Sequence, residues 1–470
     1  MTKTTSILAE FITKIRFQDI PKPVIEVAKR QLLDSIGCAL AGINSEKGRI
    51  SLLYAQRFDN NQEATIIGAK RKVSSPMAAF VNGELFNALD YDPLLAPFGH
   101  VTPYVLSAIL ALSEYKKVSG EVLALAVVLA HEIAQRIAGG LVVPPEFAKS
   151  TTRKGTMIHL PIHGYGVNIF GGVGGASKIL GLSKSQVEHA MGIAGYWCPV
   201  PTLMQFSDTV PSSMSKFSPA GWISQAQLTI SFLAEMGYTG DINVFDGEFG
   251  FWKSFAANGW RPEVVVDALG SHWYLTQDRV GFKRYPCCGA MHGVIDILNA
   301  IIKKFRVQPE DIKGLNVLLN LLAELSLWKN RDIRTHIEAQ FSAAYVFSVV
   351  CHQIEVGYKW QLPETYTNPH ILEFMDKINI LTPADPDFES KNNMVEVIVE
   401  DKKTKEEKIY TERDVWPISM EMSDQELFDK FVHNSKDILS VNNTERIIKI
   451  ILSLEELDDV SRLMDLLAPS

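Results

Sequence analysis

A helical repeat of apolar residues runs through more than half of this chain and limits the folds that it can form. From Ser6 to about Ala257, apolar residues recur at three- and four-residue spacing, with proline or glycine near the ends of several segments. The segments expected to form helices are Val24–Ala41, a stretch that starts at Ser75, Val105–Tyr115, Glu121–Ile137, Lys184–Tyr196 and Ser218–Met236. This pattern predicts a mainly α fold class.

The most strongly apolar of these segments is Glu121–Ile137. It contains His131, Glu132 and Arg136, whereas a membrane span needs about 20 nearly uncharged residues. We therefore expect a buried core helix here and no membrane-spanning part.

The pattern changes after about residue 265. The expected strands are Gly314–Leu322, Asn393–Glu400 and its hairpin partner Lys408–Glu412, and the expected helices are Ala339–Cys351, Asn368–Ile378 and the closing segment Ser423–Leu467. With 470 residues, the chain is too long for a single core. We predict a large all-helical domain of residues 1–265, completed by residues 405–470, and a smaller α+β domain of residues 266–404 inserted before the C-terminal helical segment.

Composition narrows the possible partners. The net charge is -8 and hydrophobic residues make up 46% of the chain, which is the balance of a soluble globular protein. The acidic surplus argues against nucleic acid or an anionic membrane as the main partner, but a pocket can still be locally basic and bind a small anion. The five cysteines are an odd number without framework spacing, and the first residues have no signal-peptide pattern, so we expect a reduced, cytoplasmic setting.

The densest group of reactive side chains is Lys283–His292 (KRYPCCGAMH). It combines two cations, two adjacent thiols and a histidine, which is hard to explain by core packing. It also lies near the change from helical to strand-rich sequence, and such boundaries favour binding clefts. We expect the cations and His292 to be the working groups and Cys287 and Cys288 to be compact wall residues, with Cys288 the one to test first.

Two further groups precede this motif. Asp90-Tyr91-Asp92 and the following Gly99-His100 occupy a proline-containing linker, which predicts a loop between two helices, where catalytic groups concentrate. Taken alone, this group favours a structural interpretation, in which an aspartate caps the next helix and His100 lies on the surface. Lys216 precedes a very apolar helix and is either a solvated charge or an ammonium group that points into a cleft and stabilises an anion.

A glycine-rich stretch follows His159. It holds five glycines between Gly166 and Gly175 but no phosphate-binding loop motif, so we expect the small residues to let two helices approach closely. His163 is the functional candidate here, with His159 as its rival. A metal site built from histidines and cysteines is a further alternative, for which the ligands would be His100, His163, Cys287, Cys288 and His292. Adjacent cysteines seldom both bind one ion with good geometry, so we expect no metal.

Taken in order, these motifs resemble the MmgE/PrpD family. The matching stretches are Leu32–Gly37, Ala78–Gly83 leading to Leu89–Asp92, His100, the glycine-rich stretch after His163, Met214–Lys216, Gly247–Phe251 and Lys283–His292. The resemblance runs nearly end to end, and the Tyr-Pro-Cys-Cys block with a following histidine is among the more specific marks of the family. It implies a large all-helical domain completed by the C-terminal segment, a smaller α+β lid, no cofactor and a homodimer.

The resemblance also implies which residues line the cleft. The expected catalytic residues are Asp90, His100, His163, Lys216 and His292, and the expected substrate-binding residues are Lys283, Arg284 and Cys288. The family includes 2-methylcitrate dehydratases, cis-aconitate decarboxylases and iminodisuccinate epimerases. In this chain the loop Pro93–Pro103 is more apolar than in the dehydratase pattern and lacks its extra acid, which argues against 2-methylcitrate as the substrate.

The three activities share one chemical step, the formation of a carbanion next to a carboxylate. Lysine, arginine and protonated histidine side chains stabilise such a charge, and one fixed donor in a dry cleft contributes about 3 kcal/mol. A histidine can move the proton, and Asp90 is expected to orient that histidine. We therefore expect a cofactor-independent lyase or isomerase acting on a small di- or tricarboxylic acid, either cis-aconitate decarboxylase-like or dehydratase-like. The alternative is a non-catalytic carboxylate-binding or helical interaction protein derived from this family.

Overall fold

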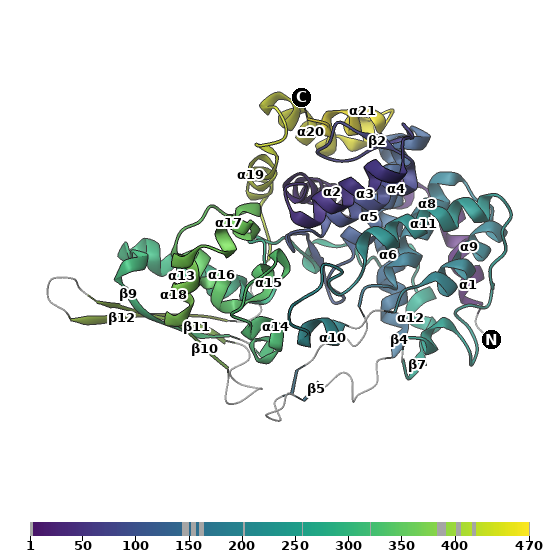
Figure 1. Cartoon of the computed structure of the whole chain (residues 1–470). Helices are drawn as coiled ribbons and strands as arrows, with labels where there is room; N and C mark the ends of the chain where they lie inside the picture. The colour runs from purple at the N-terminus through teal and green to yellow at the C-terminus, as the bar shows by residue number, and fades with distance from the viewer. Residues whose placement is uncertain are drawn as a thin grey trace.

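The computed structural model describes residues 3–142, 150–151, 157–158, 164–200, 203–255, 257–319, 321–382, 392–400, 406–415 and 420–469. Helices dominate this part of the chain, so the predicted mainly α class is confirmed (Figure 1). The helices of the first half are α1 (Thr4–Lys14), α2 (Lys22–Gly42), α3 (Glu46–Phe58), α4 (Ser75–Phe86), α5 (Thr102–Lys116), α6 (Gly120–Gly140), α8 (Asn168–Leu180), α9 (Lys184–Trp197), α10 (Leu203–Asp208), α11 (Ala220–Glu235) and α12 (Pro262–Val266). Short 3-10 turns are η1 (Phe17–Asp19), η2 (Phe251–Lys253), η3 (Gln277–Arg279), η4 (Gly289–Met291), η5 (Pro309–Asp311), η6 (Leu321–Glu324), η7 (Tyr358–Gln361), η8 (Met375–Lys377), η10 (Leu454–Glu456) and η11 (Asp465–Leu467).

The apolar helix α6 lies among α2, α5 and α8, as predicted for a core helix. Among the described helices it alone is long and apolar enough to cross a membrane, but 94% of its apolar window is buried inside the protein. Its two buried charged residues pair with each other, since Arg136 Nε lies 2.6 Å from Glu132 Oε1. A Cβ atom at Gly171 would lie 2.3 Å from the carbonyl oxygen of Ala130 on α6, so the glycines of α8 do allow the predicted close approach of two helices.

The first 265 residues are not purely helical, which corrects the prediction of an all-helical domain. Among the described residues, two short pairs join neighbouring segments: β1 (Ala64–Thr65) with β2 (Lys72–Val73), and β5 (Ser150–Thr151) with β6 (Met157–Ile158). Two others join segments that are distant in sequence: β4 (Leu141–Val142) with β7 (Gly259–Trp260), and β3 (Leu94–Leu95) with β8 (Val280–Gly281), which lies beyond residue 265. Strands of two residues are too short to produce an alternating pattern in the sequence. The β3–β8 pair brings the loop after Asp92 beside the start of the Lys283–His292 motif.

The second half contains a four-stranded sheet in the order β10-β9-β11-β12, which has its own apolar core. The strands are β9 (Ile312–Leu318), β10 (Ile378–Leu381), β11 (Asn392–Glu400) and β12 (Glu407–Val415), and the helices are α13 (His292–Phe305), α14 (Ser326–Lys329), α15 (His336–Phe341), α16 (Ala343–Cys351), α17 (Pro363–Tyr366) and α18 (Pro369–Phe374). The predicted hairpin of β11 and β12 is confirmed. Strand β10 was missed because it follows a helical segment directly and pairs in parallel with β9, far away in sequence.

The chain returns to the helical part at its C-terminus. Helices α19 (Asp424–Ser435), α20 (Val441–Leu452) and α21 (Ser461–Met464) follow the sheet, and α19 and α20 pack on α2 (Figure 1). Apolar residues of this segment, such as Phe431 and Ile447, belong to the same core as α2 and α5. The predicted helical character of this segment is therefore confirmed. Strand β12 continues the sheet to Val415, beyond residue 404, and the proposed division into domains with a lid remains a prediction.

Candidate active site

The loop between α4 and α5 carries the centre of the site. Asp90 lies four residues after the end of α4 and has a left-handed backbone conformation, with φ of 53°. Lys216, in the segment before α11, has the same conformation, with φ of 51°. A left-handed conformation of a residue other than glycine costs about 1–3 kcal/mol and persists only where the surroundings impose it, often at functional sites.

The carboxylate of Asp90 lies between two lysines. Its Oδ1 atom is 2.8 Å from Lys216 Nζ and its Oδ2 atom is 2.6 Å from Lys283 Nζ. The three side chains are at most 1% exposed, so this ion triad is removed from water. Burial alone would raise the pKa of Asp90, but the two ammonium groups outweigh it and the pKa lies well below its usual range. The carboxylate is therefore charged.

The two lysines differ in their own surroundings. Burial lowers the pKa of Lys216, although Asp90 opposes this effect. Burial also acts against a charged Lys283, but Asp90 and Asp92 outweigh it, and the pKa of Lys283 is raised. Lys283 donates in addition to the backbone carbonyl of Asp90, at 2.8 Å. Of the two cations, Lys216 loses its proton more readily.

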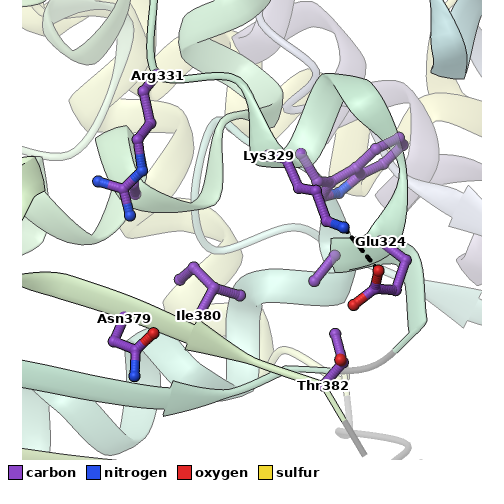
Figure 2. Close-up of a pocket in the computed structure, with 9 residues that line it drawn as sticks. Glu324, Lys329, Arg331, Asn379, Ile380 and Thr382 are labelled. Carbon is purple, nitrogen blue, oxygen red and sulfur yellow. Dashed lines mark hydrogen bonds and ion pairs between the residues drawn. The ribbon is translucent and has the colours of Figure 1, made fainter. Parts of the chain in front are cut away.

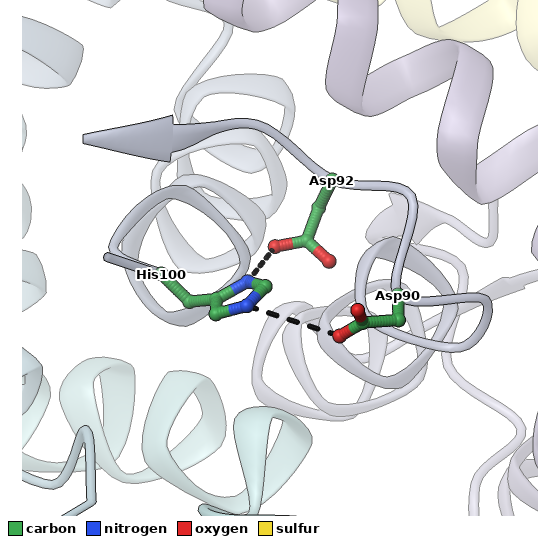
Figure 3. A group of neighbouring side chains, drawn as sticks. All are labelled: Asp90, Asp92 and His100. Carbon is green, nitrogen blue, oxygen red and sulfur yellow. Dashed lines mark hydrogen bonds and ion pairs between the residues drawn. The ribbon is translucent and has the colours of Figure 1, made fainter. Parts of the chain in front are cut away.

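His100 is oriented by Asp92 and not by Asp90, which corrects the expected role of Asp90. His100 Nδ1 lies 2.5 Å from Asp92 Oδ2, whereas His100 Nε2 lies 3.8 Å from Asp90 Oδ1 (Figure 3). Burial would raise the pKa of Asp92, but His100 and Lys283 outweigh it and the pKa is lowered. An ionised Asp92 accepts the Nδ1 proton, which leaves Nε2 as the ring nitrogen of His100 that faces Asp90. Asn87 Nδ2 in turn donates to Asp92 Oδ1 at 3.2 Å.

Aromatic rings form the wall around His100. The ring of Phe217 lies 5.0 Å from the imidazole and that of Tyr165 lies 5.4 Å from it, edge to face. Gly99 has φ of 78°, and a Cβ atom there would lie 2.6 Å from Tyr165 Oη, so only glycine fits. The phenylalanine ring also covers Lys216, whose Nζ is 5.1 Å from the ring centre. The charged groups are thus enclosed by apolar surface, where electrostatic interactions are strong.

The end of the Lys283–His292 motif lies beside this centre. Burial, followed by the charge of Lys283, lowers the pKa of His292 to about 3. Burial raises the pKa of Cys288, while Asp90 and Lys283 act on the same thiol in opposite directions. His292 is therefore a neutral imidazole and Cys288 a neutral thiol at pH 7. The charge of Lys283 acts on both groups. Cys287 is fully buried in the core of the sheet region.

The structure does not place the Arg284 side chain in the cluster, and it does not describe His163. The side chain of Arg284 is 30% exposed, lies 3.8 Å from Glu426 and donates to the carbonyl of Glu421, near α19. Its backbone carbonyl accepts a hydrogen bond from Tyr91 Oη at 3.2 Å. His163 and its rival His159 lie outside the described residues. The expected roles of Arg284 and His163 stay predictions.

Asp90, Asp92 and His100 also have the types and spacing of metal ligands, since their donor atoms lie within 4.8 Å of one another (Figure 3). Both oxygens of Asp90 already contact ammonium groups. A divalent cation here would meet two positive charges a few ångströms away and would have to displace them. The residues present do not fit a metal ion.

A cavity of about 290 Å³ lies elsewhere, between η6, α14 and β10 (Figure 2). Lys329 Nζ pairs with Glu324 at 2.6 Å, and Arg331 donates to the backbone carbonyls of Met375 and Ile378. The two cations thus contact an acidic side chain and backbone carbonyls beside the pocket. This pocket is therefore a weaker candidate for catalysis than the Asp90 cluster.

Comparisons with known proteins agree with the motifs. Residues 6–263 match the MmgE/PrpD N-terminal domain and residues 285–456 match the MmgE/PrpD C-terminal domain. These matches span most of the chain, so it belongs to the MmgE/PrpD family. The chain is 27% identical to the human cis-aconitate decarboxylase over 98% of its own length and 94% of the human protein. It is 26% identical to the mouse cis-aconitate decarboxylase (99% and 94% covered) and 25% identical to that of Aspergillus terreus strain NIH 2624 (98% and 95% covered).

Proposed function

We propose that this protein is a cofactor-independent lyase that decarboxylates a small tricarboxylic acid of the cis-aconitate type through a carbanion next to a carboxylate. The observation that carries the proposal is the buried triad of Asp90, Lys216 and Lys283 with His100 beside it. Family membership and the cis-aconitate decarboxylases among its relatives support the choice of reaction. Dehydration or epimerisation of a related acid is the second candidate, since the same groups serve these reactions.

The net charge of the cluster favours an anionic substrate only when His100 is protonated. The two lysines balance the two aspartates, so the cluster is neutral with a neutral His100 and carries one positive charge with a protonated His100. An anion is therefore best bound together with a proton on the imidazole. That same proton is then in place for transfer to carbon.

The side chains of the cluster are sufficient for the proposed decarboxylation. A carbon–carbon bond to one carboxylate breaks and carbon dioxide leaves, and the electron pair spreads into a neighbouring carboxylate. Lys216 and Lys283 stabilise the charge that develops there, for which one fixed donor contributes about 3 kcal/mol. Protonated His100 delivers its proton to carbon from Nε2, while Asp92 holds Nδ1. One carbon–carbon bond is replaced by one carbon–hydrogen bond.

The test is to incubate the purified protein with cis-aconitate, citrate, 2-methylcitrate and iminodisuccinate in deuterium oxide and to follow each by NMR. Release of carbon dioxide from cis-aconitate with one deuterium in the product is expected. Loss of water or exchange at carbon without release of gas would instead identify the second candidate. No change with any of the four acids would contradict the proposal. A homodimer in the cytoplasm belongs to the same proposal through the family resemblance, and light scattering tests the dimer.

A further inference from the structure

Side-chain hydrogen bonds fix the backbone of the Asp90 loop at five consecutive carbonyl groups. The carbonyl oxygens of residues 87 to 91 each accept a hydrogen bond from a side chain of another segment. The donors are Lys216 Nζ to Asn87 (3.2 Å), Gln340 Nε2 to Ala88 (2.7 Å), Gln361 Nε2 to Leu89 (2.8 Å), Lys283 Nζ to Asp90 (2.8 Å) and Lys430 Nζ to Tyr91 (3.0 Å). Loop carbonyls ordinarily face water, so this set of donors fixes the conformation of the loop.

Two of these donors are glutamines from the part of the chain that contains the sheet. Gln340 lies on α15 and Gln361 in η7, and Gln340 Nε2 is also 2.8 Å from Gln361 Oε1. Gln361 Nε2 donates a second bond, at 2.8 Å, to the carbonyl of Pro286 in the Lys283–His292 motif. The linked amides therefore join three segments at one point. Both side chains are buried, so no water replaces these bonds if an amide is removed.

The third donor comes from the C-terminal helix α19. Lys430 Nζ lies 2.7 Å from Asp34 Oδ1 on α2 and 3.9 Å from the centre of the Tyr91 ring. It is 7% exposed, on the same face of α19 as Leu427 and Phe431. Its position between α2 and the carbonyl of Tyr91 ties the residue that follows Asp90 to the C-terminal segment.

We propose that Gln340, Gln361 and Lys430 are positioning residues of this site, which hold Asp90 in its left-handed conformation and thereby keep Lys216 and Lys283 on its two oxygens. Asp90 reaches its working position only when the region of α15 and η7 and the helix α19 are both packed against the loop. The consequence for turnover rests on the proposed function, whereas the effect on the two lysines does not.

The experiment compares Gln361→Met and Lys430→Met with Lys29→Met in the full-length protein. Methionine keeps most of the volume of either side chain and removes the donor. Lys29 is a matched control because it is also a buried lysine between α2 and the C-terminal segment, with Nζ 2.6 Å from Glu455 and 3.0 Å from the carbonyl of Leu452. Its described contacts are with Glu26, Glu455 and Leu452, outside the Asp90 loop.

Two measurements are made on each variant. The first is kcat and KM with cis-aconitate over a range of pH, where kcat is expected to fall by about 10²-fold in Gln361→Met and Lys430→Met, with little change of KM and a shifted pH profile. The second is the rate at which acetic anhydride labels Lys216 and Lys283, followed by mass spectrometry, which is expected to rise in these two variants. Lys29→Met should alter melting temperature without altering either measurement.

The outcomes separate the two proposals. If the wild-type protein turns over none of the four acids but the two variants expose Lys216 and Lys283 to the reagent, the proposed function fails and the positioning role stands. If labelling and kcat of both variants match those of Lys29→Met, the positioning role is overturned. Should Gln361→Met not fold, Gln361→Glu replaces it, because glutamate keeps the size but replaces the NH2 group, which donates to Leu89 and Pro286, with an oxygen that faces carbonyl oxygens.

Discussion

Asp90 and Lys216 are 126 residues apart in sequence, yet both adopt a left-handed backbone conformation and their charged atoms lie 2.8 Å apart. The strained backbone of both residues directs the carboxylate of Asp90 and the ammonium group of Lys216 toward each other in a buried site. Removing the charge of Asp90 leaves two buried ammonium groups without the carboxylate between them, and breaking a buried ion pair costs about 3–5 kcal/mol. We therefore expect the site to be sensitive to substitution of Asp90.

The first prediction concerns the charge of Asp90. Asp90→Asn keeps the shape and tolerates the left-handed conformation, so it isolates the charge. We expect kcat to fall by at least about 10²-fold and the free energy of unfolding at pH 7 to fall by about 3–5 kcal/mol. Because the native pKa of Asp90 is depressed, its contribution is present above the unfolded pKa of about 3.9 and is lost as pH falls through the native pKa. Urea unfolding should show the difference from wild type shrinking below pH 4; a constant difference from pH 3 to 7 would contradict this.

The second prediction concerns Lys216. Because burial lowers its pKa, the loss of its proton should produce the alkaline decline of kcat/KM, while Lys283 stays charged. Arginine cannot lose its charge in this range. Lys216→Arg should therefore be slower than wild type but should lack the alkaline decline. An unchanged decline in this variant would assign it to another group.

The third prediction concerns Gly99. Gly99→Ala forces a left-handed alanine and places its Cβ atom against Tyr165 Oη, so we expect a loss of about 1–3 kcal/mol in stability and a displaced Tyr165 beside His100. Gly181→Ala is the control, because Gly181 has φ of 66° with nothing within 4 Å of the added atom. Both variants should lower the melting temperature, but only Gly99→Ala should lower kcat. Equal kcat values would show that Gly99 does not affect the site.

The fourth prediction concerns Arg284, which the sequence assigned to substrate binding. Its guanidinium group lies 3.8 Å from Glu426 and donates to the carbonyl of Glu421 on a partly exposed surface, where an ion pair contributes about 1 kcal/mol or less. Arg284→Met should therefore change kcat/KM by less than about fivefold. Lys283→Met, in the neighbouring position, should abolish turnover. A large rise of KM in Arg284→Met would restore the original assignment.

The fifth prediction concerns His292. With a pKa lowered to about 3 by burial and by Lys283, His292 should remain a neutral imidazole throughout the pH range of the assay. NMR of the histidine ring protons should show no titration of His292 between pH 5 and 8. Since the unfolded histidine has a pKa of about 6.5, His292 contributes stability that is lost as pH falls below that value. A midpoint near 6.5 in the folded protein would contradict both statements.

Several features could be predicted because they depend on short stretches of sequence. The spacing of apolar residues indicated α2, α5, α6, α9 and α11, and the charged turn indicated the hairpin of β11 and β12. Asp90, His100, Lys216 and Lys283 were identified through family motifs, and the structure brings all four together. The pairing of Asp92 with His100 could not be read from sequence, because two aspartates two residues apart offer the same group.

The residues that hold the Asp90 loop left weaker signals. Lys430 is a charged residue on the apolar face of an amphipathic helix, and Gln340 precedes an almost entirely apolar stretch, so both departed from their local pattern. The sequence of either segment does not indicate which carbonyl oxygens Lys430 and Gln340 bind. Those partners lie more than 250 residues away and are chosen by the packing of whole elements.

The sequence by itself determined the mainly α class, the family and the kinds of chemical groups available, because periodicity and motifs are local properties of the chain. Only the tertiary structure decided that Asp90 bridges Lys216 and Lys283, that Asp92 orients His100, and that Arg284 faces the segment around α19. The physical reason is that a buried charge is stable only beside a partner, and the partner is fixed by which distant segments pack together.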